Sequence, residues 1–406
     1  MDPVIKGRCE IQWLLADACW ILLLGTAFGS TNITRVQNPE ADMNISQIIS
    51  YWGYPSEKYD VKTEDGFILG VFRIPYGKRN SNQTAQRPVV YLQHGMFVSA
   101  SIWIANPPES SLAFALADAG CDVWMGNSRG TVWSRKHTHY SPESPKFWAF
   151  SFDEMAKYDL PATLNFILNK TSQEQLYYLG HSQGTTTAFA AFSTNPTLSS
   201  RIKLFFALAP VVSVQYSKGP LKALISIPTP ILKVIFGRKE LIPMSSLNQF
   251  LGSQVCNQKI FSHLCAGLFF HVSGYNQKNF NMSRLDVYLS QNPAGTSVQN
   301  IVHWRQILYS AKFQAYDWGN PAKNMAHYNQ VTPPLYDLGA IKVQTVIWNG
   351  GQDLFAAPKE VEKLLPKLPK LLYYRKIPYY NHIDFLLGID APNEFFPEIL
   401  YLINEW

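Results

Sequence analysis

The stretch that decides the fold is residues 176–192, which read LYYLGHSQGTTTAFAAF. Its first four residues form an apolar run that predicts a buried strand. A Gly-x-Ser-x-Gly turn follows, and small and apolar residues then continue at helical spacing. A turn this tight from strand to helix leaves little space beside the serine backbone, so Gly180 and Gly184 are needed on either side of it. The context predicts that the hydroxyl of Ser182 is a nucleophile held above a sheet.

The same five-residue pattern occurs a second time, as GNSRG at residues 126–130. This match also follows an apolar run, but the segment after it, TVWSRKHTH, has no amphipathic helical pattern. The nucleophile is therefore assigned to Ser182 on its context and not on the pattern alone. Ser128 is expected in a glycine-bounded loop at a strand end, held by Asn127 and Arg129.

The apolar content of the chain is ordinary for a soluble globular protein. With 406 residues the chain is long enough for one large domain with an insertion, or for two domains. The net charge is +6, but the basic residues are scattered and form no run. Binding of nucleic acid is therefore not expected.

The N-terminus reads as a signal peptide covering residues 1–29. Lys6 and Arg8 give a basic start, an apolar core follows at 18–24, and small residues precede a cleavage point after Gly29. A membrane anchor is the alternative, but the uncharged run is too short to span a bilayer. We therefore expect a secreted protein without a transmembrane anchor, with the lysosomal lumen as the alternative location.

Asn-x-Ser/Thr sequons agree with a secretory route. Five occur, which is suggestive of glycosylation beside a signal peptide. They are at Asn32, Asn44, Asn82, Asn169 and Asn281.

The five cysteines divide into three groups. Cys9 and Cys19 leave with the signal peptide. Cys256 and Cys265 are close enough to close a small loop in an oxidising compartment. Cys121, in an apolar run, is expected as a buried free thiol.

From Pro88 onward, strands and helices alternate, which predicts a mostly parallel sheet covered on both faces. An Asp-Gly pair at 65–66 predicts a hairpin before that point. The expected strands are 89–93, 121–125, 176–179, 204–208, 343–348 and 371–377, and the expected helices include 111–119, 155–168 and 358–365.

Between residues 212 and 334 the alternation breaks, over a length too great for a loop in a compact domain. It is rich in Pro, Phe, Leu and Ile, and we expect it to form a helical cap inserted over the carboxyl edge of the sheet. The first part of the core is then 30–211 and the second part 335–406. Helical runs are expected at 221–236 and 260–272.

A serine hydroxyl needs a base within hydrogen-bond reach and a carboxylate that orients the base. In α/β-hydrolases these residues follow in the chain order Ser, acid, His, on loops after late strands. Asp353 lies in a glycine-rich loop after the strand 343–348, and His382 lies after the strand 371–377. The sequence therefore predicts a Ser182–His382–Asp353 triad. The alternative for Asp353 is a turn residue or a helix cap.

Other titratable residues have structural interpretations. Asp384 lies two residues after His382, but its apolar neighbours favour a structural acid. His181 is expected in packing or hydrogen bonding. His137 and His139 form a pair with metal-ligand spacing, but without a third ligand a solvated loop is favoured. No metal and no cofactor is expected.

Attack of a serine hydroxyl on a carbonyl carbon creates an oxyanion that backbone N–H groups must stabilise. One donor is expected from Gln183, the residue after the nucleophile. The second is expected from Met96, in the loop that reads His94-Gly95-Met96 after the strand 89–93, where glycine permits close approach. A plain turn is the alternative for this loop on its own.

Five motifs together resemble the acid lipase family of α/β-hydrolases. They are YLQHG at 91–95, DVWMGNSRG at 122–130, FWAFSFDEMAKYDLPA at 147–162, GHSQG at 180–184 and WNGGQD at 348–353. The resemblance implies an α/β-hydrolase core, a cap with a mobile lid, and hydrolysis of acyl esters of glycerol or sterols, often at acidic pH. It also implies the triad Ser182, Asp353 and His382 and a cap disulfide Cys256–Cys265. Met96 departs from the family, which usually has leucine there.

The leading hypothesis is a lipase that acts on long-chain lipid esters at an oil–water or membrane interface. The lipid-facing side chains of its lid are then expected to include Phe269 and Phe270. Two alternatives are a carboxylesterase for short soluble esters and a catalytically silent lipid-binding protein. The intact set of Ser182, Asp353 and His382 argues against the silent protein.

Overall fold

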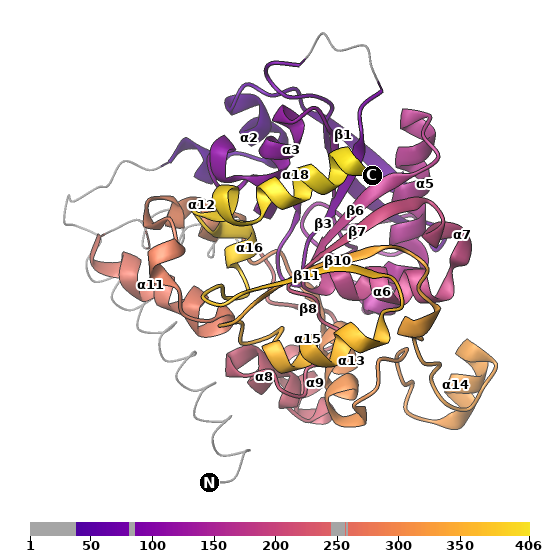
Figure 1. The fold of residues 1–406 in the computed structure, drawn as a ribbon. Helices are drawn as coiled ribbons and strands as arrows, with labels where there is room; N and C mark the ends of the chain where they lie inside the picture. The colour runs from indigo at the N-terminus through magenta and orange to yellow at the C-terminus, as the bar shows by residue number, and fades with distance from the viewer. Residues whose placement is uncertain (1–37, 81–85, 245–255, 257–258) are drawn as a thin grey trace.

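The computed structural model describes residues 38–80, 86–244, 256 and 259–406 (Figure 1). Within them, nine strands form one sheet in the order β1-β2-β4-β3-β6-β7-β10-β11, with β5 paired to β2. The strands from β4 to β11 in this order are parallel, and β1, β2 and β5 are antiparallel to their neighbours. Their bounds are β1 (Glu57–Lys62), β2 (Phe67–Ile74), β3 (Val89–Gln93), β4 (Asp122–Gly126), β5 (Lys136–His137), β6 (Leu176–His181), β7 (Ile202–Leu208), β10 (Thr345–Gly350) and β11 (Leu371–Ile377).

The expected hairpin is present between β1 and β2. Thr63 and Phe67 are joined by a backbone hydrogen bond, and Gly66 has a φ of +100°, a value that favours glycine. The mostly parallel sheet predicted from the alternation is also confirmed.

Helices cover both faces of the sheet, and the central strands are therefore buried on both sides. On β3, Val90 and Leu92 enter one hydrophobic cluster, and Val89 and Tyr91 enter the other. The first cluster is covered by α2 (Ile45–Tyr51), α3 (Leu112–Asp118) and α18 (Phe396–Glu405). The second is covered by α5 (Leu160–Thr171), α6 (Gln183–Thr194) and α15 (Pro358–Leu364). Short helices α4 (Phe152–Glu154), α7 (Pro196–Ser199), α16 (Asp384–Leu387) and α17 (Ala391–Glu394) complete the core.

The segment between β7 and β10 is mainly helical. Most of its buried apolar side chains belong to the first hydrophobic cluster. In Figure 1, α8, α9 and α13 lie together below the sheet, and α11 and α12 lie to its left. The bounds are α8 (Gly219–Ser226), α9 (Thr229–Phe236), β8 (Glu240–Leu241), α11 (Lys259–Ser273), α12 (Leu285–Gln291), β9 (Thr296–Ser297), α13 (Val298–Ser310) and α14 (Pro321–Tyr328). The exact limits of a cap domain remain a prediction.

Two expected helices differ from the structure. The run 221–236 is two helices, α8 and α9, which meet at 103° because Pro228 interrupts the backbone hydrogen bonds. The run 155–168 starts with a π-helical turn, Met155–Asp159, just before Pro161. Among the described residues, no single helix has the length and apolarity to cross a membrane.

Candidate active site

Ser182 lies at a sharp turn between β6 and α6. Its φ is +53° and its ψ is −123°, a conformation that is strained for any residue with a side chain. A Cβ on Gly184 would lie 2.4 Å from the carbonyl oxygen of Gln93, and a Cβ on Gly180 would lie 2.9 Å from the carbonyl carbon of Gly184. Both glycines are therefore required by close backbone contacts, as the sequence pattern predicts.

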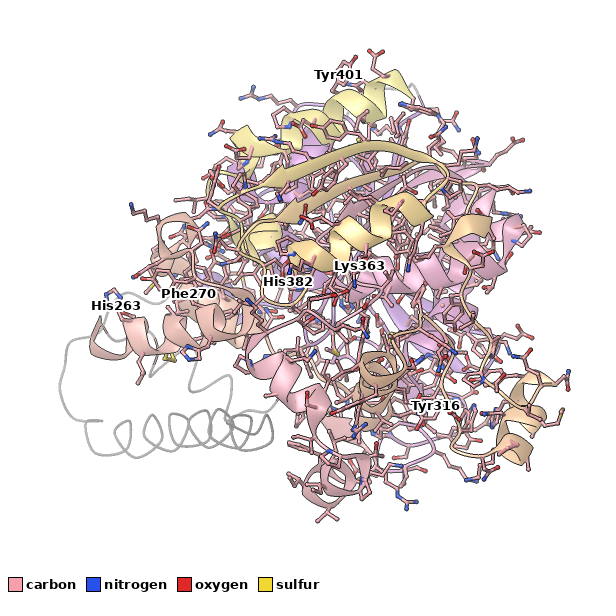
Figure 2. The ribbon with its side chains drawn as sticks, turned by 60° about the horizontal axis from the view of Figure 1, so that its bottom comes forward. His263, Phe270, Tyr316, Lys363, His382 and Tyr401 are labelled. Atoms are coloured by element: carbon pink, nitrogen blue, oxygen red, sulfur yellow. A yellow bond between two sulfur atoms is a disulfide. The ribbon has the colours of Figure 1, made fainter. Side chains whose placement is uncertain are left out.

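The loops after β10 and β11 bring an acid and a base to this turn. The Nε2 atom of His382 lies 2.8 Å from Oγ of Ser182, and its Nδ1 atom lies 2.8 Å from Oδ2 of Asp353. The Asp353 side chain is fully buried, whereas His382 remains partly exposed. Figure 2 shows His382 at the junction between the sheet and the inserted helices. The structure thus joins the three residues in one continuous chain of hydrogen bonds.

Asp353 combines both of the roles considered for it. Its Oδ1 atom accepts hydrogen bonds from the backbone N–H groups of Phe355 and Ala356, each at 2.8 Å. Its Oδ2 atom faces His382. Because the local turn fixes one oxygen, the other is held in a set direction toward the imidazole.

Two further residues close the space around Ser182. A Cβ on Gly95 would lie 2.8 Å from Cβ of Ser182, so only glycine permits this approach. The ring of His181 hydrogen-bonds through Nε2 to the carbonyl oxygen of His382, at 2.8 Å. Burial, and then the nearby His382, hold the pKa of His181 well below its usual value. His181 is therefore neutral, donates through Nε2, and supports the loop that carries the base.

The loop after β3 meets the start of α6 because β3 and β6 are neighbours in the sheet. Parallel strands end at the same edge, and the chain leaves β3 toward β4 on one side and reaches β6 on the other. Gln183 is the first residue of α6, where N–H groups have no partner within the helix. Met96 lies in the β3 loop, beside Gly95.

Ser128 occupies a different environment. Its Oγ atom accepts a hydrogen bond from Nε2 of Gln93, and its backbone N–H donates to Nε2 of His94. The neighbouring Arg129 is buried in ion pairs with Asp65 and Asp159. The second glycine-bounded serine is thus part of a structural loop, as expected.

The remaining candidates also have structural roles. The Oδ2 atom of Asp384 accepts from the N–H of Asn381 and from Nδ2 of Asn276. Nδ1 of His137 accepts from the backbone of His139. Among the described residues, no group of three metal-ligating side chains occurs.

Sequence reasoning missed two residues at this site. Nδ2 of Asn300 and Nε1 of Trp304 both donate to Oε1 of Gln183. They come from α13 in the insertion, and no local pattern marks them.

The cysteines and sequons fall as follows. Cys256 and Cys265 are bonded, and Cys121 is a buried free thiol. Asn44 and Asn169 are exposed, and Asn281 is partly exposed. Use of these sequons remains a prediction. Asn32, Asn82, the expected signal peptide 1–29, Cys9 and Cys19 lie outside the described residues.

Phe269 and Phe270 pack inward in this structure. Phe270, which is labelled in Figure 2, is buried. Its ring contacts Phe280 and Tyr275, and the ring of Phe269 contacts Phe280. Their contact with lipid remains a prediction. It requires α11 to move so that these two side chains become exposed.

A serine on such a turn, with its base and acid on loops after later parallel strands, defines a serine ester hydrolase with the α/β-hydrolase fold. A family model for the alpha/beta hydrolase fold matches residues 88–389, and one for a partial alpha/beta-hydrolase lipase region matches residues 45–107.

Comparison with curated proteins narrows this class. Lipase member K of Homo sapiens is 58% identical, over 97% of this chain and 98% of its own length. Gastric triacylglycerol lipase of Homo sapiens is 56% identical, over 97% of this chain and 99% of its length. Lysosomal acid lipase/cholesteryl ester hydrolase of Macaca fascicularis is 52% identical, over 98% of this chain and its full length (100%). The chain belongs to the acid lipase family of α/β-hydrolases.

Proposed function

We propose that this protein hydrolyses the carboxylic ester bonds of acylglycerols, with sterol esters as a second substrate class. The observation that carries the proposal is the continuous hydrogen-bond chain Ser182–His382–Asp353. The names of two relatives, a triacylglycerol lipase and a cholesteryl ester hydrolase, support the substrate class. The same relatives support a secreted protein, with the lysosomal lumen as the alternative.

The geometry suits an acyl-enzyme mechanism. Oγ of Ser182 attacks the ester carbonyl while Nε2 of His382 takes its proton, and Asp353 holds the imidazole in the required tautomer. The backbone N–H groups of Gln183 and Met96 are the proposed donors to the oxyanion. His382 then gives its proton to the departing alcohol. A water molecule, activated by the same base, releases the fatty acid and restores Ser182.

A surface of the insertion supports action at a lipid interface. The outward side of α9 carries Ile231, Val234 and Ile235, which are 51%, 84% and 60% exposed. Lys233 and Arg238 are exposed beside them. Apolar side chains next to cations suit an interface whose lipids or released fatty acids are negatively charged. We call these three apolar residues the α9 face.

The experiment that tests the function measures hydrolysis of a triglyceride series and a cholesteryl ester between about pH 4 and pH 8, with Ser182→Ala as the blank. A sharp rise in rate where the substrate forms an emulsion supports a lipase. Fast hydrolysis of short soluble esters without that rise would instead identify a carboxylesterase. Absence of labelling by a fluorophosphonate would revive the silent lipid-binding protein.

A further inference from the structure

The side chain of Gln183 contacts the insertion through hydrogen bonds with helix α13. It is almost fully buried, and its Oε1 atom accepts two hydrogen bonds, at 2.8 Å from Nδ2 of Asn300 and at 2.7 Å from Nε1 of Trp304. A carbonyl oxygen has two lone pairs, so both are used. The two donors are four residues apart on α13 and therefore lie on the same face of that helix.

Asn300 is itself held from several sides. Its backbone N–H donates to Oγ of Ser297, the N-cap of α13, and its Oδ1 atom accepts from the N–H of Phe152. Its Nδ2 atom also lies 3.1 Å from Oγ1 of Thr296 and 3.6 Å from Sδ of Met96. Asn300 thus contacts the side chains of both residues proposed to supply the oxyanion hole.

The face of α13 that carries these donors is fixed to the core of the hydrolase. Oγ of Ser297 donates to the carbonyl oxygen of Phe150. The ring of His303 stacks on Phe152 with centroids 4.0 Å apart, and its Nδ1 atom lies 3.0 Å from Oγ of Ser151. Asn300, His303 and Trp304 are all fully buried. Helix α13 is therefore seated rigidly beside the first turn of α6.

We propose that Asn300 and Trp304 are positioning residues for the oxyanion hole, which act through the side chain of Gln183 to fix its backbone N–H. This inference rests on the proposed function, in which that N–H stabilises the oxyanion. It makes the hole dependent on the insertion, because both donors to Gln183 come from α13. Without them a buried amide oxygen loses its partners, and the side chain would turn to find others.

The first test variant is Asn300→Asp. It keeps the size of the side chain and the oxygen that accepts from Phe152, but it replaces the donor that faces Gln183 with an acceptor. Trp304→Phe is the second variant, because it removes the indole N–H and keeps an aromatic ring. Tyr309→Phe, on the exposed part of the same helix, is the matched control.

The readout compares a soluble oxoester with its thionoester, whose sulfur is a poor acceptor for oxyanion-hole donors. Loss of a whole donor costs about 100- to 1,000-fold in kcat. For a displaced donor we expect Asn300→Asp and Trp304→Phe to lower kcat for the oxoester about 10-fold or more, with KM within about twofold. The oxoester-to-thionoester rate ratio should fall several-fold in both variants and stay unchanged in Tyr309→Phe.

A purely structural role would lower both rates equally and leave the ratio unchanged, which would overturn the proposal. Unfolding of both variants would also overturn it, because the contacts would then serve stability alone. Failure of the underlying function is seen separately, as wild-type protein that a fluorophosphonate does not label at Ser182.

Discussion

Ser182 and Ser128 have the same glycine spacing in the sequence and differ in what surrounds them in space. Ser182 is followed by a helix and faces an imidazole. Ser128 is followed by a loop and accepts a hydrogen bond from the amide of Gln93. A hydroxyl becomes a nucleophile only beside a base that takes its proton, so the five-residue pattern cannot by itself identify the catalytic serine.

We predict that Ser182→Ala abolishes ester hydrolysis and that Ser128→Ala leaves a folded, active enzyme. Loss of a triad serine costs on the order of a million-fold in kcat. Loss of the Ser128 hydroxyl removes one partner of Gln93, which costs about 1 kcal/mol of stability and no catalytic group. Kinetics on a soluble ester, with circular dichroism to check folding, measures both effects. Equal losses in two folded variants would contradict the assignment.

The helices of the insertion differ in whether their apolar side chains are exposed or buried. On α9 only Leu232 is buried, so most of its apolar residues face outward. On α11 the apolar residues lie on several sides, with Phe270 buried and Leu264 exposed. A buried apolar side chain contributes to folding, whereas an exposed apolar group is free to enter a lipid surface. The α9 face is therefore the better candidate for contact with substrate aggregates.

We predict that Val234→Ser combined with Ile235→Ser weakens action on emulsified triglyceride more than on a short soluble ester. Each side chain should lose about 1 kcal/mol of adsorption energy, or about fivefold in surface binding. Rates on the two substrates and adsorption to lipid monolayers check this.

Tyr401→Ser is the control for this pair. Tyr401 is 62% exposed on α18, at the opposite side of the molecule from α9 (Figures 1 and 2). The Tyr401→Ser variant should leave the rates on both substrates unchanged. An equal fall on both substrates in the α9 variant would show that these residues support the fold and not the interface.

The molecule as a whole buries several carboxyl groups, which links its stability to pH. Burial raises the pKa of Asp384 to about 7, with smaller contributions from Asp390 and Asp353, against opposing hydrogen bonds from Asn381 and Asn276. Burial likewise raises the pKa of Asp153 and Glu154. A carboxyl whose pKa is higher in the folded state than in the unfolded state binds protons more tightly when folded. Its contribution to stability is complete below about pH 4 and is lost as the pH rises toward about 7.

We predict that the unfolding temperature of Asp384→Asn rises relative to that of the wild type between about pH 5 and about pH 7.5, because only the wild type loses the contribution of the Asp384 carboxyl over this range. For one group the difference in unfolding free energy over this range is up to about 3 kcal/mol. An amide keeps the acceptor for Asn381 and Asn276 but does not ionise. Thermal unfolding at several pH values measures the slopes. Parallel curves for the variant and the wild type would show that Asp384 does not carry the effect.

The features of this protein that could be predicted from its sequence depend on residues that are close together along the chain. The glycines around Ser182, and Asp353 and His382 just beyond strand ends, are features of short segments. They predict the candidate site because parallel strands must end at one edge of a sheet. The alternation of strands and helices predicts the core for the same reason.

The contacts between segments that are far apart along the chain could not be predicted in this way and follow from how the elements pack. Asn300 and Trp304 lie 117 and 121 residues from Gln183 along the chain. No pattern in the sequence around them indicates that their side chains donate to Gln183. Whether the apolar side chains of α9 are exposed and that of Phe270 is buried depends on which elements pack against each helix. An apolar run in the sequence does not show which of its side chains will be covered. Backbone conformation is set largely by residues a few positions apart, whereas side-chain partners are set by the packing of whole elements.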